Sequence, residues 1–319
     1  MKLITNISDW IKALFLTVKA VANNQMFVLR KAAMGDVLWV EPILRKLALE
    51  KRDVFFISEW NSLYENFPFP NVRFIPNNNK SYKRAAKIMH ALGLTKNVVY
   101  LNNSYEKQPD KHFLLVYQEA AGLPIEKEYP RLYLNDEERN RYKHLKPYIV
   151  IHLETTSPMN HRQIYGINWP DLIEFLKSKY LQTPYFIAQH PEEYQLINHF
   201  ELSTIRDMIA FIYSADLFIG VDSGPSHIAA SLNIPSLIFF GSINPWFRHF
   251  KESFNGIIMQ QPCEFAHCYH RPQKRKKDYS CLLVGDDGIP KCCAFENEMI
   301  KNQVENLLAK QPVSTVDRE

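Results

Sequence analysis

The segment of residues 213–242, YSADLFIGVDSGPSHIAASLNIPSLIFFGS, constrains the fold more than any other part of the chain. Two apolar runs, residues 217–221 and 236–240, enclose a polar turn at residues 222–227 and a run of small residues at 228–232. Short continuous apolar runs bounded by turn residues are typical of buried parallel strands. We therefore expect a strand, a tight loop, a helix and a strand, with a loop and helix N-terminus that can hold phosphate through backbone N–H groups.

The same alternation extends to both sides of this segment. Apolar runs predict further strands at residues 26–29, 53–57, 72–75, 97–101, 148–153 and 185–188. Helical segments separate these runs, the first of them expected as a single helix at residues 37–49, and alternating strands and helices favour an α/β fold with parallel sheets. The chain has 319 residues, enough for two domains, and its hydrophobic content of 46% supports a large core. Ligands of such sheets bind beyond the carboxyl ends of the strands, so the loops there form the candidate site.

Two other segments share residues with a known family. Residues 26–45 read MFVLRKAAMGDVLWVEPILR, and Trp169-Pro170 precedes an amphipathic helix. Together with Ala215-Asp216-Leu217, the run GVDSGPSH at residues 220–227 and Phe240-Gly241, they resemble glycosyltransferase family 9, the heptosyltransferases of bacterial surface glycans. The order and spacing of these segments make the resemblance specific.

The resemblance implies the GT-B architecture, in which two doubly wound Rossmann-like domains face a cleft. We expect an acceptor-side domain at residues 26–146 and a nucleotide-sugar-binding domain at residues 147–310, with an amphipathic helix at residues 1–25 and a tail at residues 311–319. The implied activity is inverting transfer of heptose or another sugar from a nucleotide-diphosphate sugar to a hydroxyl acceptor, such as a bacterial surface glycan. No catalytic metal is expected.

Asp36 is the candidate catalytic residue. It lies in the loop Met34-Gly35-Asp36 after the first expected strand, where the resemblance implies the catalytic acid. A carboxylate there can accept the proton of the acceptor hydroxyl. An aspartate at the start of a helix is also typical of an N-cap, so capping is the alternative role.

The donor is expected to bind at the strand ends of the second domain. Backbone N–H groups near Ser223 and Gly224 can stabilise the leaving diphosphate, and Gly224 permits close approach of the backbone. Asp222 and His227 are expected to contact sugar hydroxyls or phosphate, with a locally bonded His227 as the alternative. The resemblance adds the nucleotide-binding positions Thr155, Thr156, Ser157, and Glu192 or Glu193. A solvated helical turn is the alternative for the two glutamates.

Ile167 departs from the family pattern. Family members commonly carry a lysine that binds donor phosphate two residues before the Trp-Pro pair, and this sequence has Ile167 there. Arg162 lies on the same loop and can supply the missing charge. The resemblance therefore supports sugar transfer more strongly than it supports heptose. A non-catalytic nucleotide-sugar-binding protein is the alternative function.

All five cysteines lie between residues 263 and 293. This clustering favours a metal site or reduced thiols over an evenly distributed disulfide framework. We expect one structural zinc or iron ion, with disulfides or free thiols as the alternatives. The expected ligands are Cys263, Cys268, Cys281 and either Cys292 or Cys293.

A basic run, RPQKRKK, occupies residues 271–277 within the same corner of the sequence. A solvated loop is the expected interpretation. Contact with an anionic acceptor, whether a phosphorylated glycan, a lipid headgroup or nucleic acid, is the alternative. A transferase that acts on DNA or protein is therefore a further alternative function.

Residues 4–21 carry apolar side chains at helical spacing. Lys2, Asp9, Lys12 and Lys19 interrupt them, so the run lacks the uncharged core of a signal peptide. We expect an amphipathic helix that packs its apolar face on its own domain, with an interfacial membrane helix over residues 1–22 as the alternative. No run is apolar enough to span a membrane, and the expected location is cytoplasmic, with peripheral contact at the inner membrane face as the accompanying alternative.

Overall fold

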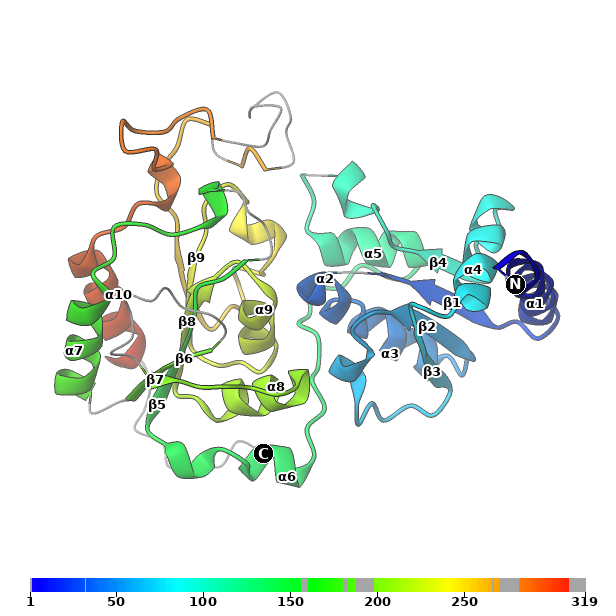
Figure 1. Cartoon of the computed structure of the whole chain (residues 1–319), viewed down its shortest axis with the longest axis horizontal. Helices are drawn as coiled ribbons and strands as arrows, with labels where there is room; N and C mark the ends of the chain where they lie inside the picture. The colour runs from blue at the N-terminus through cyan, green and yellow to red at the C-terminus, as the bar shows by residue number, and fades with distance from the viewer. Residues whose placement is uncertain are drawn as a thin grey trace. The chain divides into compact units, whose positions relative to one another are not determined.

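The computed structural model describes residues 2–31, 33–108, 110–155, 160–180, 183–187, 198–265, 267–269 and 281–309. The chain divides into two compact units, Met1–Leu134 and Asn135–Glu319 (Figure 1). The first unit therefore ends 12 residues before residue 146, the expected end of the first domain. None of the helices within the described ranges combines the length and apolarity needed to cross a membrane.

Unit 1 is built on a four-stranded parallel sheet in the order β3-β2-β1-β4. Its strands are β1 (Met26–Leu29), β2 (Val54–Ser58), β3 (Val72–Pro76) and β4 (Val98–Tyr100). Its helices are α1 (Lys2–Ala22), α2 (Met34–Leu38), α3 (Glu41–Leu49), α4 (Lys80–Ala91) and α5 (Phe113–Ala121), with the short 3₁₀ helices η1 (Asn61–Tyr64) and η2 (Tyr105–Lys107). One sheet face, including Phe27, Phe55 and Ile57, packs on α1 and α4. The apolar runs thus located the strands correctly.

The single helix expected at residues 37–49 is wrong. The structure has two helices there, α2 and α3, separated at Trp39 and Val40. Pro42 lies in the first turn of α3 and has no N–H to bond the carbonyl four residues earlier, at Leu38. The break places Asp36 on a five-residue helix of its own, close to the end of β1.

Helix α1 packs on α4 through small side chains. Ala13, Thr17 and Ala20 are buried, and Ala85 and Ala86 of α4 belong to the same core cluster. Small residues on both helices let the two backbones approach closely. The expected packing of the large apolar face of α1 on its own domain is therefore wrong, because that face is exposed.

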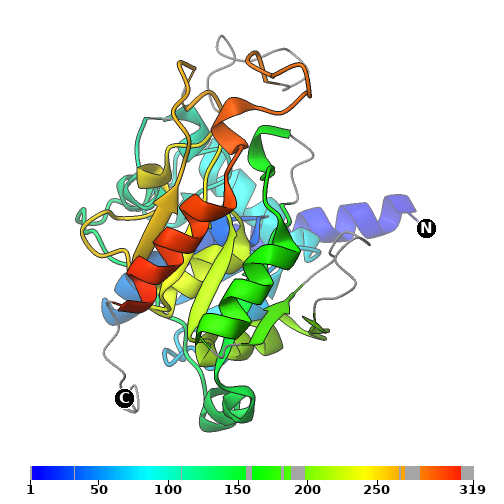
Figure 2. The same cartoon turned by 90° about the vertical axis from the view of Figure 1, so that its left-hand side faces the viewer.

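Unit 2 is built on a six-stranded parallel sheet in the order β10-β9-β8-β5-β6-β7. Its strands are β5 (Tyr148–His152), β6 (Thr183–Phe186), β7 (Asn198–His199), β8 (Leu217–Val221), β9 (Ser236–Phe239) and β10 (Gly256–Met259). Its helices are α6 (Asp136–Asn140), α7 (Trp169–Tyr180), α8 (Ile205–Ser214), α9 (Gly224–Ser231) and α10 (Asn297–Ala309). Short 3₁₀ helices are η3 (Lys143–Leu145), η4 (Asn160–Arg162), η6 (Pro245–Phe247) and η8 (Lys291–Cys293). Helices α7 and α10 cover one face of the sheet, and α8 and α9 cover the other (Figures 1 and 2).

The strand, loop, helix and strand expected in residues 213–242 are confirmed as β8, α9 and β9. Strands β5, β8 and β9 are neighbours in the sheet. The loops that follow their carboxyl ends therefore lie next to one another, at the edge where doubly wound sheets bind their ligands.

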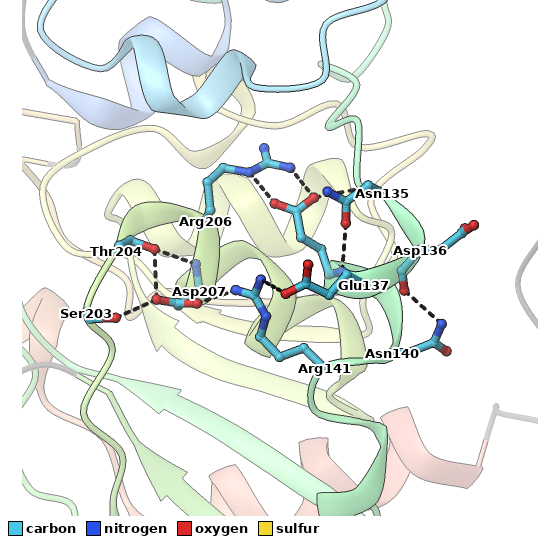
Figure 3. Close-up of polar contacts among 10 residues, drawn as sticks. Asn135, Asp136, Glu137, Asn140, Arg141, Ser203, Thr204, Arg206 and Asp207 are labelled. Carbon is cyan, nitrogen blue, oxygen red and sulfur yellow. Dashed lines mark hydrogen bonds and ion pairs between the residues drawn. The ribbon is translucent and has the colours of Figure 1, made fainter.

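Two ion pairs fasten α6 to α8 at the start of unit 2 (Figure 3). Both Glu138 carboxylate oxygens accept hydrogen bonds of 2.7 Å from Arg206, and Arg141 pairs with Asp207. Burial works against the Glu138 charge, yet the bonds from Arg206 and from the Asn135 N–H lower the pKa of this carboxyl below its usual value. The chain that enters unit 2 is thereby fixed to the helix that leads into β8.

Candidate functional site

Asp36 lies beside Arg30 at the carboxyl end of β1. The Arg30 guanidinium donates to Asp36 Oδ2 and, at 3.0 Å, to the carbonyl oxygen of Leu101. The Tyr105 hydroxyl donates to the same Asp36 oxygen at 3.2 Å, and Glu106 Oε1 lies 3.5 Å from Arg30. Two donors on one oxygen hold the carboxylate in a fixed orientation.

The capping role considered for Asp36 is wrong. Ala33 occupies the N-cap position of α2, and Asp36 lies inside the first turn of that helix. The carboxylate instead accepts hydrogen bonds from Arg30, which follows β1, and from Tyr105 of η2. Ala33 itself has a φ of 67°, a conformation that is rare for residues other than glycine and that is often found near functional sites.

Arg30 is enclosed by aromatic rings. Its guanidinium carbon lies 5.3 Å from the centre of the Tyr105 ring and 5.8 Å from that of Tyr117, and the residue is 5% exposed. Sequence reasoning gave no role to Arg30, although it directly follows the first expected strand. Nothing in the sequence pointed to Tyr105, which reaches Asp36 only because β4 lies beside β1 in the sheet.

The donor loop of unit 2 is closed by local hydrogen bonds. The Ser226 hydroxyl accepts from the Ser223 N–H at 3.2 Å and donates to the Ser223 carbonyl at 2.7 Å, which caps α9. The Ser223 hydroxyl lies 3.2 Å from Nδ1 of His152, the last residue of β5. Gly224 begins the helix. The predicted residues Asp222, Ser223 and Gly224 thus occupy the turn between β8 and α9.

Arg162 meets Asp222 at this turn. Arg162 Nη2 donates to the Asp222 backbone oxygen at 2.6 Å and to its Oδ2 at 2.9 Å. The guanidinium lies over the Tyr269 ring at 5.2 Å. Arg162 Nε is buried and has no hydrogen-bond partner within the described residues. The loop of η4 therefore places the Arg162 guanidinium at the carboxyl end of β8, where the sequence predicted a cation.

His227 is buried among polar side chains of the same turn. Its Nε2 lies 3.8 Å from Asp222 Oδ1, and its ring stacks on that of His249 at 5.1 Å. Burial lowers the pKa of His227 to about 3 and that of His249 well below its usual value. Both rings are neutral near pH 7, so the positive partner of Asp222 is Arg162 and not a histidine.

Gly241 lets the loop of η4 pack on the end of β9. A Cβ at Gly241 would lie 2.1 Å from the His161 carbonyl oxygen and 2.5 Å from Cys293 Sγ. The Ser242 N–H donates to the same carbonyl at 3.1 Å, and the Ser242 hydroxyl lies 2.7 Å from His161 Nδ1. A glycine at this position is thus needed to place the loop that carries Arg162.

Several predicted positions lie outside the described residues: Thr156, Ser157, Glu192, Glu193, the basic run at 271–277 and the tail at 311–319. Thr155 is described and half-buried after β5. The site also contains residues that sequence reasoning missed, namely His152, His161, Ser242 and His249. Only His152 carried a signal, since it ends the apolar run of β5.

The cysteines surround a small cavity of about 170 Å³. Cys263, Cys268, Cys281 and Cys292 line it, together with Gly241 and Ser242. Cys293 is not among the lining residues, but its Sγ lies 3.6 Å from that of Cys292. None of the five cysteines forms a disulfide within the described residues. Within the described ranges, which omit residues 266 and 270–280, no three or more His, Cys, Asp or Glu side chains are arranged to hold a metal ion.

The family model for glycosyltransferase family 9 (heptosyltransferase) matches residues 82–278. Lipopolysaccharide heptosyltransferase 1 of Campylobacter coli is 44% identical over 55 residues, which is 17% of this chain and 16% of that protein. Lipopolysaccharide heptosyltransferase 3 of Escherichia coli is 38% identical over 64 residues, 18% of this chain and 19% of that protein. The match thus spans less than a fifth of each curated relative.

Solved structures resemble the chain over most of its length. A glycosyltransferase family 9 protein from Veillonella parvula DSM 2008 superposes with a TM-score of 0.60 and 13% identity, covering 90% of this chain and 97% of that one. The iron-containing dodecameric glycosyltransferase TibC from enterotoxigenic E. coli H10407 has a TM-score of 0.65 and 15% identity, covering 89% and 76%. TibC has also been solved with ADP-D-β-D-heptose, and that structure has a TM-score of 0.62 and 17% identity, covering 89% and 75%. These likenesses show the GT-B fold.

Proposed function

Because the chain belongs to glycosyltransferase family 9, we propose that it transfers a sugar from a nucleotide-diphosphate sugar to a hydroxyl group of a glycan, with inversion at the anomeric carbon. The observation that carries this proposal is the meeting of Arg162 and Asp222 at the carboxyl end of β8. Arg162 Nε, a buried donor that has no partner among the described residues, favours an anionic ligand there. The ADP-heptose complex of TibC makes ADP-heptose the first donor to test.

In this proposal the protein groups divide the chemistry between the two units. Asp36 accepts the proton of the acceptor hydroxyl as it attacks the anomeric carbon. Arg162 and the N-terminal N–H groups of α9 stabilise the charge that develops on the leaving diphosphate. Asp222 holds the guanidinium in place and orients the sugar. No step in this scheme requires a metal ion.

A screen of nucleotide sugars tests the proposal. The full chain is heated with and without each compound, and release of nucleoside diphosphate is followed in the presence of an acceptor glycan. A true donor at about 100 times its dissociation constant should stabilise the folded protein by about 2.7 kcal/mol. If no nucleotide sugar stabilises the protein, the proposal fails.

A non-catalytic nucleotide-sugar-binding protein is a second candidate function. The observation that favours it is Ile167, which stands where family members commonly have a lysine. The same screen separates the two functions, because a binding protein would be stabilised by a nucleotide sugar but would release no nucleoside diphosphate.

We also propose that one structural zinc or iron ion is held by Cys263, Cys268, Cys281 and Cys292. Four cysteine thiols that line one cavity have the chemistry of a closed tetrahedral site. Burial raises the pKa of Cys268 to about 11, while a hydrogen bond with Cys293 lowers the pKa of Cys292, so metal binding would have to displace protons. TibC, which resembles this chain in fold, is an iron-containing protein.

Elemental analysis of protein purified without added metal should find close to one equivalent of zinc and iron together. Cys281→Ser should lose that metal and melt at a lower temperature, because one of four ligands is gone. Cys293→Ser is the matched control and should retain the metal, since Cys293 does not line the cavity. Less than about one-tenth of an equivalent in the unmodified protein would end the metal proposal.

Two expectations from the sequence stay predictions. A cytoplasmic location is one of them. Transfer to DNA or protein is the other, since the basic run at residues 271–277 on which it rests lies outside the described residues.

A further inference from the structure

Helix α1 presents a continuous apolar face that no described part of unit 1 covers. Half of the large apolar side chains that are exposed in the described chain lie on this one helix. They are Ile7, Trp10, Ile11, Leu14, Phe15, Val18 and Val21, with exposures from 48% to 68%. The spacing of residues 7, 11, 14, 18 and 21 places them on one side of the helix. An exposed apolar stripe of this length marks a surface that contacts something else.

The opposite side of α1 fixes this orientation. Asp9 forms an ion pair of 3.4 Å with Arg84 of α4. Trp10, at the edge of the apolar face, has its ring 5.0 Å from the Arg84 guanidinium carbon. The Asn97 side chain donates to the Ala20 carbonyl oxygen at 3.1 Å. With Ala13 and Ala20 fully buried, the helix is anchored at both ends and in the middle, so it cannot turn its apolar side inward.

The two helices that form this surface are strongly basic. Helices α1 and α4 together carry seven Lys and Arg residues and one Asp, a net charge of +6, whereas the whole chain has +4. Helix α4 contributes Lys80, Lys83, Arg84 and Lys87 and no acidic residue. The single acid, Asp9, is already paired with Arg84. Helices α1 and α4 lie side by side (Figure 1), so positive charge is concentrated on the pair of helices that includes the apolar stripe.

A cavity of about 790 Å³ lies where α1 meets the start of α4, and both apolar and basic side chains line it. Ile11, Phe15 and Leu16 of α1 supply apolar walls, and Lys12 and Lys80 supply positive charge. Asp9, which is paired with Arg84, also lines the cavity. An apolar wall next to two ammonium groups suits a molecule with a hydrocarbon part and an anionic headgroup.

We propose that α1 and α4 bind the surface of an anionic lipid bilayer. The apolar stripe would enter the boundary between headgroups and acyl chains, and the lysines would contact the anionic headgroups. A second copy of the chain fits this surface poorly, because pairing it with itself would bring two clusters of +6 together. The inference goes beyond the transfer reaction and does not depend on it.

Flotation of the full chain with vesicles tests this inference. One set of vesicles contains phosphatidylcholine alone, and the other contains phosphatidylcholine and phosphatidylglycerol in about equal amounts. The protein should float with the anionic vesicles at least about tenfold more than with the neutral ones, and high salt should reduce this binding. Equal binding to both, or binding to neither, would overturn the proposal.

Two pairs of variants locate the surface. Ile11→Ser with Phe15→Ser should lower vesicle binding about tenfold or more and leave the melting temperature unchanged, because both side chains are exposed. Leu49→Ser with Ile125→Ser removes exposed apolar groups elsewhere in unit 1 and should bind as the unmodified protein does. Lys80→Glu with Lys87→Glu should weaken binding to anionic vesicles, whereas Lys177→Glu on α7 should not.

The same variants test the alternative that a second copy of the chain binds the apolar stripe. The molar mass of each protein is measured in solution without vesicles. If Ile11→Ser with Phe15→Ser converts an oligomer into a monomer while vesicle binding is unaffected, the stripe joins copies of the chain and the lipid proposal is wrong.

Discussion

Replacing Asp36 by Asn should lower turnover about 100-fold or more while donor affinity stays nearly unchanged. An amide oxygen can still accept the hydrogen bonds that Arg30 and Tyr105 now donate to Oδ2, so the local structure should be retained. The amide cannot take up the proton of the acceptor hydroxyl. Turnover with saturating donor and acceptor measures the loss, and donor titration measures affinity.

Asp53→Asn is the matched control for this experiment. Asp53 is an exposed carboxylate at the start of β2 in the same unit, and its side chain takes no part in the group around Arg30. Turnover of this control should equal that of the unmodified protein. If Asp36→Asn also retained near-normal turnover, Asp36 could not be the general base.

Replacing Arg162 by Ala should weaken the binding of nucleoside diphosphates about 10- to 100-fold and that of the nucleoside far less. Hydrogen bonds from a guanidinium to an anion contribute about 1.5–3 kcal/mol, and only the diphosphate carries the charge to receive them. The variant also leaves the Asp222 carboxylate without its cation, which adds repulsion towards phosphate. Calorimetric titration with both ligands gives the two affinities.

A double variant separates these two effects. If Arg162 served only to neutralise Asp222, Arg162→Ala combined with Asp222→Asn would recover diphosphate affinity; if Arg162 contacts phosphate, the loss would remain. Lys177→Ala, which removes an exposed cation on α7, should leave both affinities unchanged. Equal losses for nucleoside and diphosphate in Arg162→Ala would show that Arg162 only supports the loop.

Much of the candidate site could be located from sequence because its loops follow apolar runs. The runs before Asp36 and Asp222 are buried strands, β1 and β8; Asp222 directly follows β8, and Asp36 lies on α2, the helix that follows β1. Burial on both faces of a parallel sheet requires a continuous apolar sequence, so the position of each strand can be predicted from its own residues. Pro42 also carried a readable signal, the break between α2 and α3, which sequence reasoning overlooked.

The side chains that contact Asp36 and Asp222 could not be predicted from the sequence in this way. Arg162 reaches Asp222 from 60 positions away along the chain, and Tyr105 reaches Asp36 from 69 positions away. Both pairings depend on which strands are neighbours in a sheet. Strand order is decided by the packing of helices on both faces, and no single segment encodes it.

Helix α1 shows the same division within a single element. Its apolar periodicity determined that residues 2–22 form a helix with one apolar side. Which side packs was decided in the folded unit, where close approach to Ala85 and Ala86 of α4 favours the small residues Ala13 and Ala20 over the larger ones. The sequence by itself therefore determined the elements, the parallel sheets and the positions of Asp36 and Asp222 beyond their strands, because burial acts on each segment separately. Only the tertiary structure decided which side chains meet at those loops and which apolar face stays exposed, because these outcomes depend on the shapes of segments far apart in the chain.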